Sequence, residues 1–276
     1  MIRRVWELTR YQTRSLAFSL AGLVFIIAAF LFWAIFFPPG QGTPDVENYI
    51  LIIAAFGAVM TFLSTLTIAS RANRAENLPL IARLPSRIEY ITAVFSSAFV
   101  FSLFLQILVA VLALIRGPEM TLGKMMEAPP IWIALNLLAA ILALHASDLV
   151  ASGWSRVVIY GALALLLIAQ SFVQQINAWV LGFFSNLSSI FYAQQLDGMA
   201  SLMSRTALWL GGTGESLLSG ILNVVFWPFR AIGEAIINGF FTPVQALAPA
   251  VLVLYASILY LIAADLFASK DLEMTE

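Results

Sequence analysis

Residues 16–37 read LAFSLAGLVFIIAAFLFWAIFF, and none of them is charged. A hydrocarbon layer about 30 Å thick requires about 20 apolar helical residues to cross it. This segment therefore predicts a membrane-spanning helix. We expect the span to be retained, because it is longer than the apolar region of a signal peptide and ends in Pro38-Pro39-Gly40 without a small-residue cleavage pattern.

The composition favours the same class. Apolar residues make up 61% of the 276 residues, charged residues only 11%, and the mean hydropathy is +0.94. A soluble globular protein carries about 25% charged residues, so the bilayer is expected to take the place of water around this chain. The net charge of −1 argues against nucleic acid as a partner, and the absence of cysteine excludes disulfides and thiolate chemistry.

Further apolar segments of near-spanning length follow the first: Tyr49–Ser70, Ile88–Ile115, Ile131–Val150, Val157–Val173 and Val244–Ala268. We predict an all-α, polytopic bundle of about six spans in a single transmembrane domain over residues 1–276, with turns at prolines and glycines that include Pro129 and Pro130. Residues 174–243 are apolar but interrupted by polar residues, which indicates external, re-entrant or interfacial helices such as Leu217–Phe229. Two more spans, Ile176–Ala193 and Ser216–Phe229, would give eight.

The distribution of lysine and arginine predicts the orientation, because cationic loops remain on the cytoplasmic side. With six spans, most cations share the side of the two termini, among them Arg71, Arg74 and Arg83, whereas Lys124 lies on the opposite side. We therefore expect an integral protein of a bacterial plasma membrane with both termini in the cytoplasm.

The N-terminal segment, residues 1–14, mixes apolar and basic side chains and predicts a helix that lies flat on the membrane. Aromatic rings suit the interface and arginines suit anionic headgroups. The expected interfacial residues are Arg3, Arg4, Trp6, Arg10, Tyr11 and Arg14. The segment serves either as a topological anchor alone or also as an elbow helix that contacts a partner.

Residues 71–87 form the most polar link of the chain. Its apolar residues, interspersed with charges, predict a short amphipathic helix, and Pro79 is expected to disturb it. Ser86 is expected to cap the next helix, with Glu89 at the third helical position. The link is either a surface for a cytosolic partner or a solvated loop that only sets the topology.

The link, together with the segments before it, also shows a pattern similar to that of a known protein family. The order of basic amphipathic segment, two spans, Glu76, and then Leu84-Pro85-Ser86-Arg87-Ile88-Glu89-Tyr90 resembles the membrane subunit of type-2 ATP-binding-cassette (ABC) exporters. Glu76 matches the acidic position of that family's coupling helix, and Pro85 with Arg87 matches its closing signature. The ending Ala264-Asp265-Leu266-Phe267-Ala268-Ser269-Lys270-Asp271-Leu272 is similar to the family's final run.

The resemblance implies a permease that moves a substrate, for which a hydrophobic class is one option, with an ABC ATPase as a separate partner and a second permease copy beside it. The residues it assigns to partner binding are Glu76, Leu84, Pro85, Arg87 and Glu89. ATP and Mg would be held by the ATPase. No cofactor is expected on this chain, and no enzyme activity either, because Gly211-Gly-Thr-Gly-Glu215 lacks the lysine of a phosphate-binding loop.

Polar residues within the predicted spans indicate few other functions for this chain. His145 and Asp148 are spaced to share a helix face and to pair, either as a structural contact or as the proton relay of a secondary transporter. Two such ligands do not make a metal site. Gln106, Asn136 and Gln170 are expected to form interhelical hydrogen bonds. A further hypothesis is that the chain is an accessory subunit of a larger membrane complex and docks through residues 174–243.

Overall fold

The computed structural model describes residues 1–38, 45–115, 121–150, 161, 178–179, 181–209 and 215–269. All regular secondary structure in these residues is helical, as the sequence predicts. The chain divides into two compact units, one formed by Met1–Val157 with Pro228–Glu276 and the other by Val158–Trp227.

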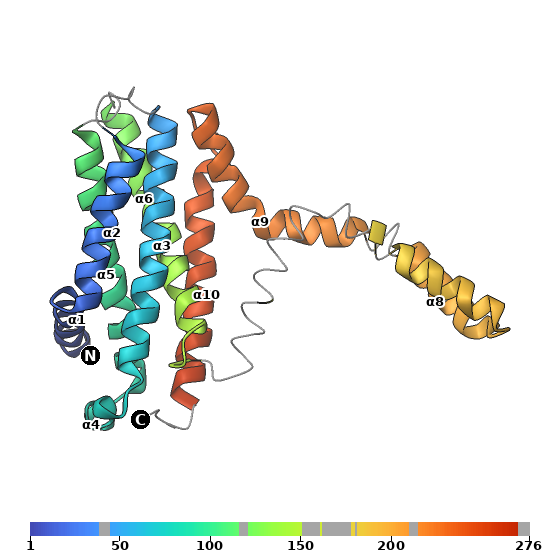
Figure 1. Ribbon diagram of the computed structural model, residues 1–276, viewed down its shortest axis with the longest axis horizontal. Coiled ribbons are helices and arrows are strands. Elements are labelled where there is room, and N and C mark those ends of the chain that lie inside the picture. Colours follow the sequence, from blue (N-terminus) through green and yellow to red (C-terminus); the bar gives the residue numbers. More distant parts are fainter. Residues whose placement is uncertain are drawn as a thin grey trace. The chain divides into compact units, whose positions relative to one another are not determined.

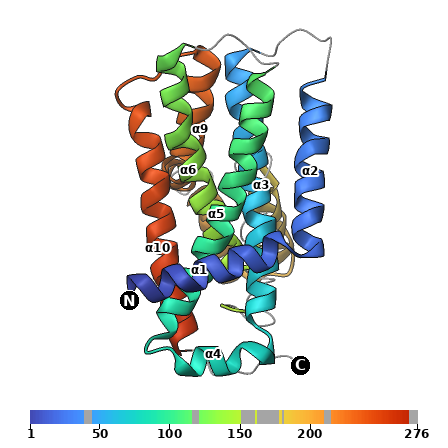
Figure 2. The same ribbon diagram turned by 90° about the vertical axis from the view of Figure 1, so that its left-hand side faces the viewer.

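The first unit is a helical bundle in which α2, α3, α5, α6 and α10 run side by side (Figures 1 and 2). Its helices are α1 (Ile2–Ala17), α2 (Leu20–Phe36), α3 (Val46–Ala72), α4 (Leu78–Arg83), α5 (Arg87–Leu114), α6 (Leu122–His145) and α10 (Ala248–Ser269). Among the described residues, four helices are long and apolar enough to cross a membrane by themselves, and α1 with α2 passes as a fifth, bent pair. This agrees with an integral membrane protein.

The bend between α1 and α2 measures 71° and has a local cause. Ser19 Oγ donates to the carbonyl of Leu16 (2.7 Å) and accepts from the amide of Gly22 (3.2 Å), so it caps α2. A Cβ on Gly22 would lie 2.2 Å from Leu16 O, which only glycine avoids. The predicted first span is therefore wrong at its start, because Leu16 belongs to α1 and α2 begins at Leu20.

The second and third predicted spans agree with α3 and α5 within a few residues at each end. The fourth does not, since α6 begins at Leu122 and carries Pro129 and Pro130 inside it, where the sequence indicated a turn. These prolines remove the helical donors for the carbonyls of Met125 and Met126. Both methionines are exposed, so their carbonyls can be solvated without ending the helix.

The core of the bundle contains an amide network that joins three helices. Gln106 on α5 is fully buried, donates through Nε2 to the carbonyl of Ile53 on α3 (3.0 Å), and accepts through Oε1 from Asn136 Nδ2 on α6 (2.6 Å). Gly57 makes room for this amide, because a Cβ there would lie 2.2 Å from Gln106 Nε2. The predicted interhelical role of Gln106 and Asn136 is confirmed, and Gln170 lies outside the described residues.

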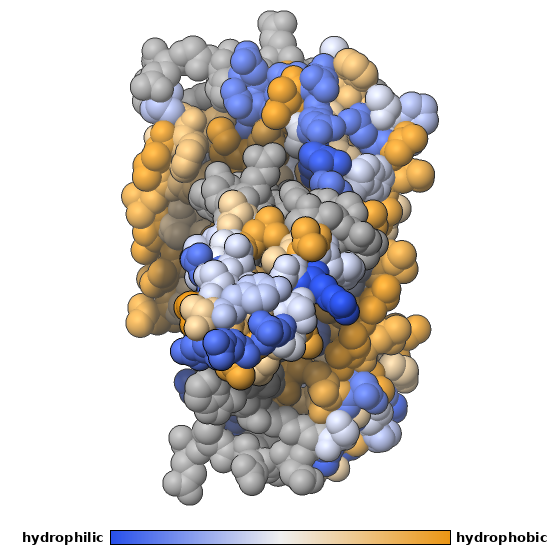
Figure 3. Space-filling model, turned by 90° about the vertical axis from the view of Figure 1, so that its right-hand side faces the viewer, coloured by the Kyte–Doolittle hydropathy of each residue, from blue (hydrophilic) through white to orange (hydrophobic). Residues whose placement is uncertain are grey.

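The outer surface of the spans is apolar. On the face drawn in Figure 3, hydrophobic side chains line both flanks, and hydrophilic ones gather near the upper end, in the middle of the view and at the lower right. A continuous apolar surface of this kind requires lipid or another apolar partner around it. On α2 alone, the exposed large apolar residues are Leu20, Leu23, Val24, Ile27, Phe30, Leu31, Ile35 and Phe36.

The second unit contains a helical hairpin. A helix over residues 181–193 turns at Gln195, which has φ 59°, into α8 (Asp197–Trp209), and Ser188 Oγ donates to Ala200 O (3.0 Å) across the pair. The helix α9 (Glu215–Asn238) belongs to this unit up to Trp227 and to the first unit from Pro228 onward, and it extends the predicted apolar piece Leu217–Phe229 at both ends. The predicted span Val157–Val173 lies outside the described residues except for Gly161, so the choice between six and eight spans stays a prediction.

Candidate coupling surface

The link between α3 and α5 folds as a short helical knob beyond the ends of these helices (Figure 2). It consists of the 3-10 turn Ala75–Asn77 and α4, whose Ile81 is buried and whose Arg83 is exposed. The predicted amphipathic helix is thus confirmed. The disturbance expected from Pro79 is wrong, because Pro79 lies in the first turn, where its missing N–H would have had no helical acceptor.

The residues assigned to partner binding take different positions. Glu76 is 72% exposed and faces Arg74 at 3.8 Å, and Pro85 is exposed as well. Leu84 and Arg87 are half-buried, and Arg87 Nη1 donates to the carbonyl of Ala268 at the end of α10 (3.3 Å). The knob therefore presents Glu76 and Pro85 outward, while Arg87 connects it to the last span.

Glu89 is buried, whereas partner binding would require it to be exposed. Its side chain is only 3% exposed, and its two carboxylate oxygens accept from Arg4 Nη2 (2.8 Å) and Nε (2.9 Å). Ser86 caps α5 as predicted, through its Oγ and the amide of Ile88 (3.2 Å). Glu89 occupies the predicted third position, but its carboxylate points to α1.

The helix α1 crosses the lower part of α5 and is held there by polar contacts (Figure 2). The bidentate pair of Arg4 and Glu89 lies at one end of the crossing, and the carboxylate raises the pKa of the Arg4 guanidinium above its ordinary value. At the other end, Ser97 Oγ lies within hydrogen-bond distance of Thr9 O (3.2 Å) and Gln12 Oε1 (3.1 Å), and its one hydrogen can be donated to either of them. All six predicted interfacial residues are exposed: Arg3, Arg4, Trp6, Arg10, Tyr11 and Arg14.

Two further hydrogen bonds lie where the link meets the ends of α3 and α5. The hydroxyl of Tyr90, buried in the first turn of α5, donates to the carbonyl of Ala72 at the end of α3 (2.9 Å). Asn77 Nδ2 donates to the carbonyl of Arg71 (2.9 Å). Asn77 thus ties the knob to the end of α3, and Tyr90 ties the end of α3 to the start of α5.

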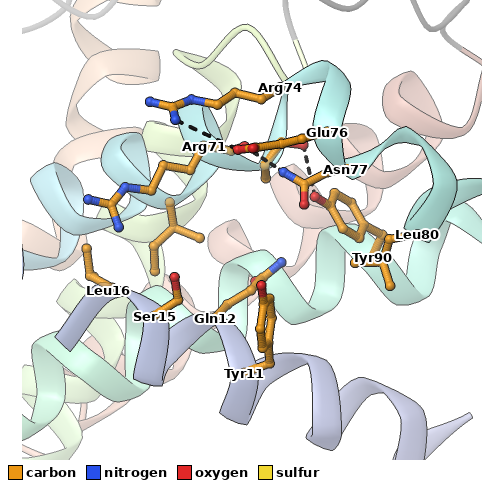
Figure 4. Close-up of a pocket in the computed structure, with 12 residues that line it drawn as sticks. Tyr11, Gln12, Ser15, Leu16, Arg71, Arg74, Glu76, Asn77, Leu80 and Tyr90 are labelled. Atoms are coloured by element: carbon orange, nitrogen blue, oxygen red, sulfur yellow. Dashed lines mark hydrogen bonds and ion pairs between the residues drawn. The ribbon is translucent and has the colours of Figure 1, made fainter. Parts of the chain in front are cut away.

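A pocket of about 270 Å³ opens between α1 and this link. In Figure 4, Tyr11, Gln12 and Ser15 of α1 face Arg74, Glu76 and Asn77 of the link across it, and Arg71 borders it. The sequence indicated α1 and the link separately. It did not indicate that they enclose a common pocket, because the 71° bend that brings them together depends on Ser19 and Gly22.

The predicted pair of His145 and Asp148 does not share a helix face. The helix α6 ends at His145, so Asp148 follows in the turn beyond it. His145 Nε2 instead lies 2.9 Å from the carbonyl of Leu259 on α10, which connects α6 to the last span. This contact favours the structural interpretation of the histidine over the proton relay.

Among the residues that the structure describes, no group of three histidine, cysteine or acidic side chains could hold a metal ion. Comparisons with protein families, with curated proteins and with solved structures find no match for this chain. The resemblance of the link and of the C-terminal run to type-2 ABC exporters therefore rests on the residues themselves.

Proposed function

We propose that this chain is the membrane permease subunit of an ATP-driven exporter of the type-2 ABC class, paired with a second permease copy and with an ATPase on another chain. The observation that carries the proposal is α4, an exposed amphipathic helix beyond the ends of α3 and α5. The exposed residues on either side of α4, Glu76 before it and Pro85 after it, are among those that the resemblance assigns to the ATPase contact. The substrate class stays open between hydrophobic and amphipathic molecules.

The hydrogen bonds around the knob supply the mechanism. Movement of the ATPase against the knob would act on the end of α3 through Asn77, and from there on the start of α5 through the bond between Ala72 O and Tyr90. The pair of Arg4 and Glu89 would carry the same movement into α1. ATP and Mg belong to the partner, and the residues of this chain transmit the movement without taking part in hydrolysis.

The test is co-purification from mild detergent with mass spectrometry of the recovered proteins. The tagged chain is expected to bring a stoichiometric ABC ATPase, and the variants Glu76→Lys and Arg87→Glu are expected to lose it. Glu234→Lys is the matched control, because Glu234 is exposed and pairs with Arg230 in α9, away from the link. Size-exclusion chromatography of each variant verifies that it is folded.

An accessory subunit of a larger membrane complex is the second candidate. It is favoured by exposed apolar side chains in the second unit, among them Trp179, Phe183, Leu208 and Trp209. Recovery of other integral membrane subunits without an ATPase would support this candidate and contradict the permease proposal. Retention of the ATPase by both link variants would contradict the assigned contact surface.

A further inference from the structure

We propose that the pocket between α1 and the 71–87 link binds the phosphate headgroup of an anionic phospholipid. The pocket is lined by Tyr11, Gln12 and Ser15 from α1 and by Arg71, Arg74 and Asn77 from the other side, as Figure 4 shows. The proposal concerns lipid and is independent of any ATPase partner.

The charge of the pocket suits a phosphate. Two arginines and one glutamate line it, so its titratable groups leave a net positive charge. Among the residues that the structure describes, the guanidinium of Arg71 has one hydrogen-bond partner, Ser19 Oγ at 3.0 Å. A guanidinium carries five N–H donors in a planar fork, so Arg71 can still bind a phosphate with two parallel hydrogen bonds. Glu76 is directed to Arg74, through an exposed pair 3.8 Å long.

The size of the pocket suits a headgroup better than a whole amphiphile. Sites for drug-sized ligands usually enclose about 300 to 1,000 Å³, whereas this pocket encloses about 270 Å³. The acyl chains would have to remain outside it, on an apolar surface.

Such a surface lies directly beside the pocket. A second, shallower depression shares Tyr11 and Ser15 with it and is bordered by Arg14 and Phe18. Phe18 is 85% exposed and Leu20, which starts the first apolar span, is 79% exposed. The guanidinium carbon of Arg14 lies 5.9 Å from the centre of the Phe18 ring, so a cation and an apolar side chain meet where a headgroup joins its acyl chains. This junction favours lipid over a soluble phosphate compound.

The experiment is native mass spectrometry of the purified full-length chain, delipidated in a neutral detergent and titrated with phosphatidylglycerol. One lipid is expected to bind more tightly than the rest. Arg71→Gln is expected to weaken its binding at least about tenfold, because it removes the charge and the two parallel hydrogen bonds of the guanidinium. Arg83→Gln removes the same charge from exposed α4 outside the pocket and is expected to change binding less than about twofold. Arg74→Gln serves as the second pocket variant if Arg71→Gln fails to fold.

Two results would overturn the proposal. Equal binding by the pocket variants and Arg83→Gln would mean that lipid binds by general surface charge. Complete displacement of the tight lipid by millimolar glycerol phosphate or inorganic phosphate would assign the pocket to soluble phosphate compounds. Persistence of the lipid against both competitors, together with the tenfold loss, would support a lipid headgroup site.

Discussion

Replacing Gln106 by leucine is expected to loosen the centre of the bundle, because this amide is the only described side chain that bonds to both α3 and α6 there. The substitution puts an apolar side chain of similar size in place of the amide on α5, so a large cavity is not its main effect. It removes the bond to Ile53 O (3.0 Å) and the bond from Asn136 Nδ2 (2.6 Å).

The magnitude follows from the two bonds. Interhelical hydrogen bonds within membranes contribute about 0.6 kcal/mol on average and at most about 1.7 kcal/mol, so losing two lowers the free energy of unfolding by about 1 to 3 kcal/mol. The loss is expected in the upper part of this range, because Asn136 Oδ1 has no partner among the described residues and the substitution leaves Nδ2 unpaired as well. Adding Asn136→Leu removes these unpaired groups, so the double variant is expected to regain part of the loss.

The assay is unfolding of the purified chain in mixed micelles of increasing SDS fraction. Trp132 on α6 is a suitable fluorescent reporter, because its Nε1 donates to Ile50 O on α3 (3.1 Å) and it therefore lies at the interface under test. Asn48→Leu is the control, since Asn48 is an exposed amide at the start of α3. An unchanged stability of Gln106→Leu, or a double variant no more stable than Gln106→Leu, would refute the reasoning.

Three further predictions concern the end of the bundle that carries the link. The single charge reversals Arg4→Glu and Glu89→Arg are each expected to lower the thermal unfolding midpoint, because the two side chains form one bidentate pair. The combined swap is expected to restore part of it. Single variants with the same midpoint as the unchanged chain would contradict this. Tyr90→Phe is expected to cost about 0.5 to 1.5 kcal/mol in the same SDS assay by removing the bond to Ala72 O, and no change would mean that the bond contributes nothing. Ser86→Ala is expected to cost about 0.5 to 2 kcal/mol through loss of the α5 cap, with Ser86→Asp as the variant that retains stability.

The positions of α3 and α5 could be predicted because long uncharged segments have only one stable conformation in lipid, the helix. The link helix and the Ser86 cap could also be predicted, since both follow from neighbouring residues. The start of α6 was missed, because proline usually ends a helix and nothing local indicates that Met125 and Met126, whose carbonyls lose their helical donors, are exposed.

The candidate site was predicted only in its parts. Glu76, Pro85 and Arg87 could be selected from the link itself, whereas the burial of Glu89 could not. Its partner, Arg4, is 85 residues away, and no local pattern distinguishes it from Arg3. The same holds for the pocket, which requires α1 to fold back towards the end of α3.

The sequence by itself determined that this chain is helical and suited to a bilayer, because the lengths of its apolar segments match the hydrocarbon thickness and its few charges lie between them. Only the tertiary structure decided which polar side chains meet: Arg4 with Glu89, Gln106 with Asn136, and His145 with the backbone of α10. The physical reason is that burial in lipid is a property of a segment, whereas a pairing depends on the rotation and crossing angle of two packed helices. Those angles are set by all the contacts between the helices together, among them the fit of Gln106 against Gly57.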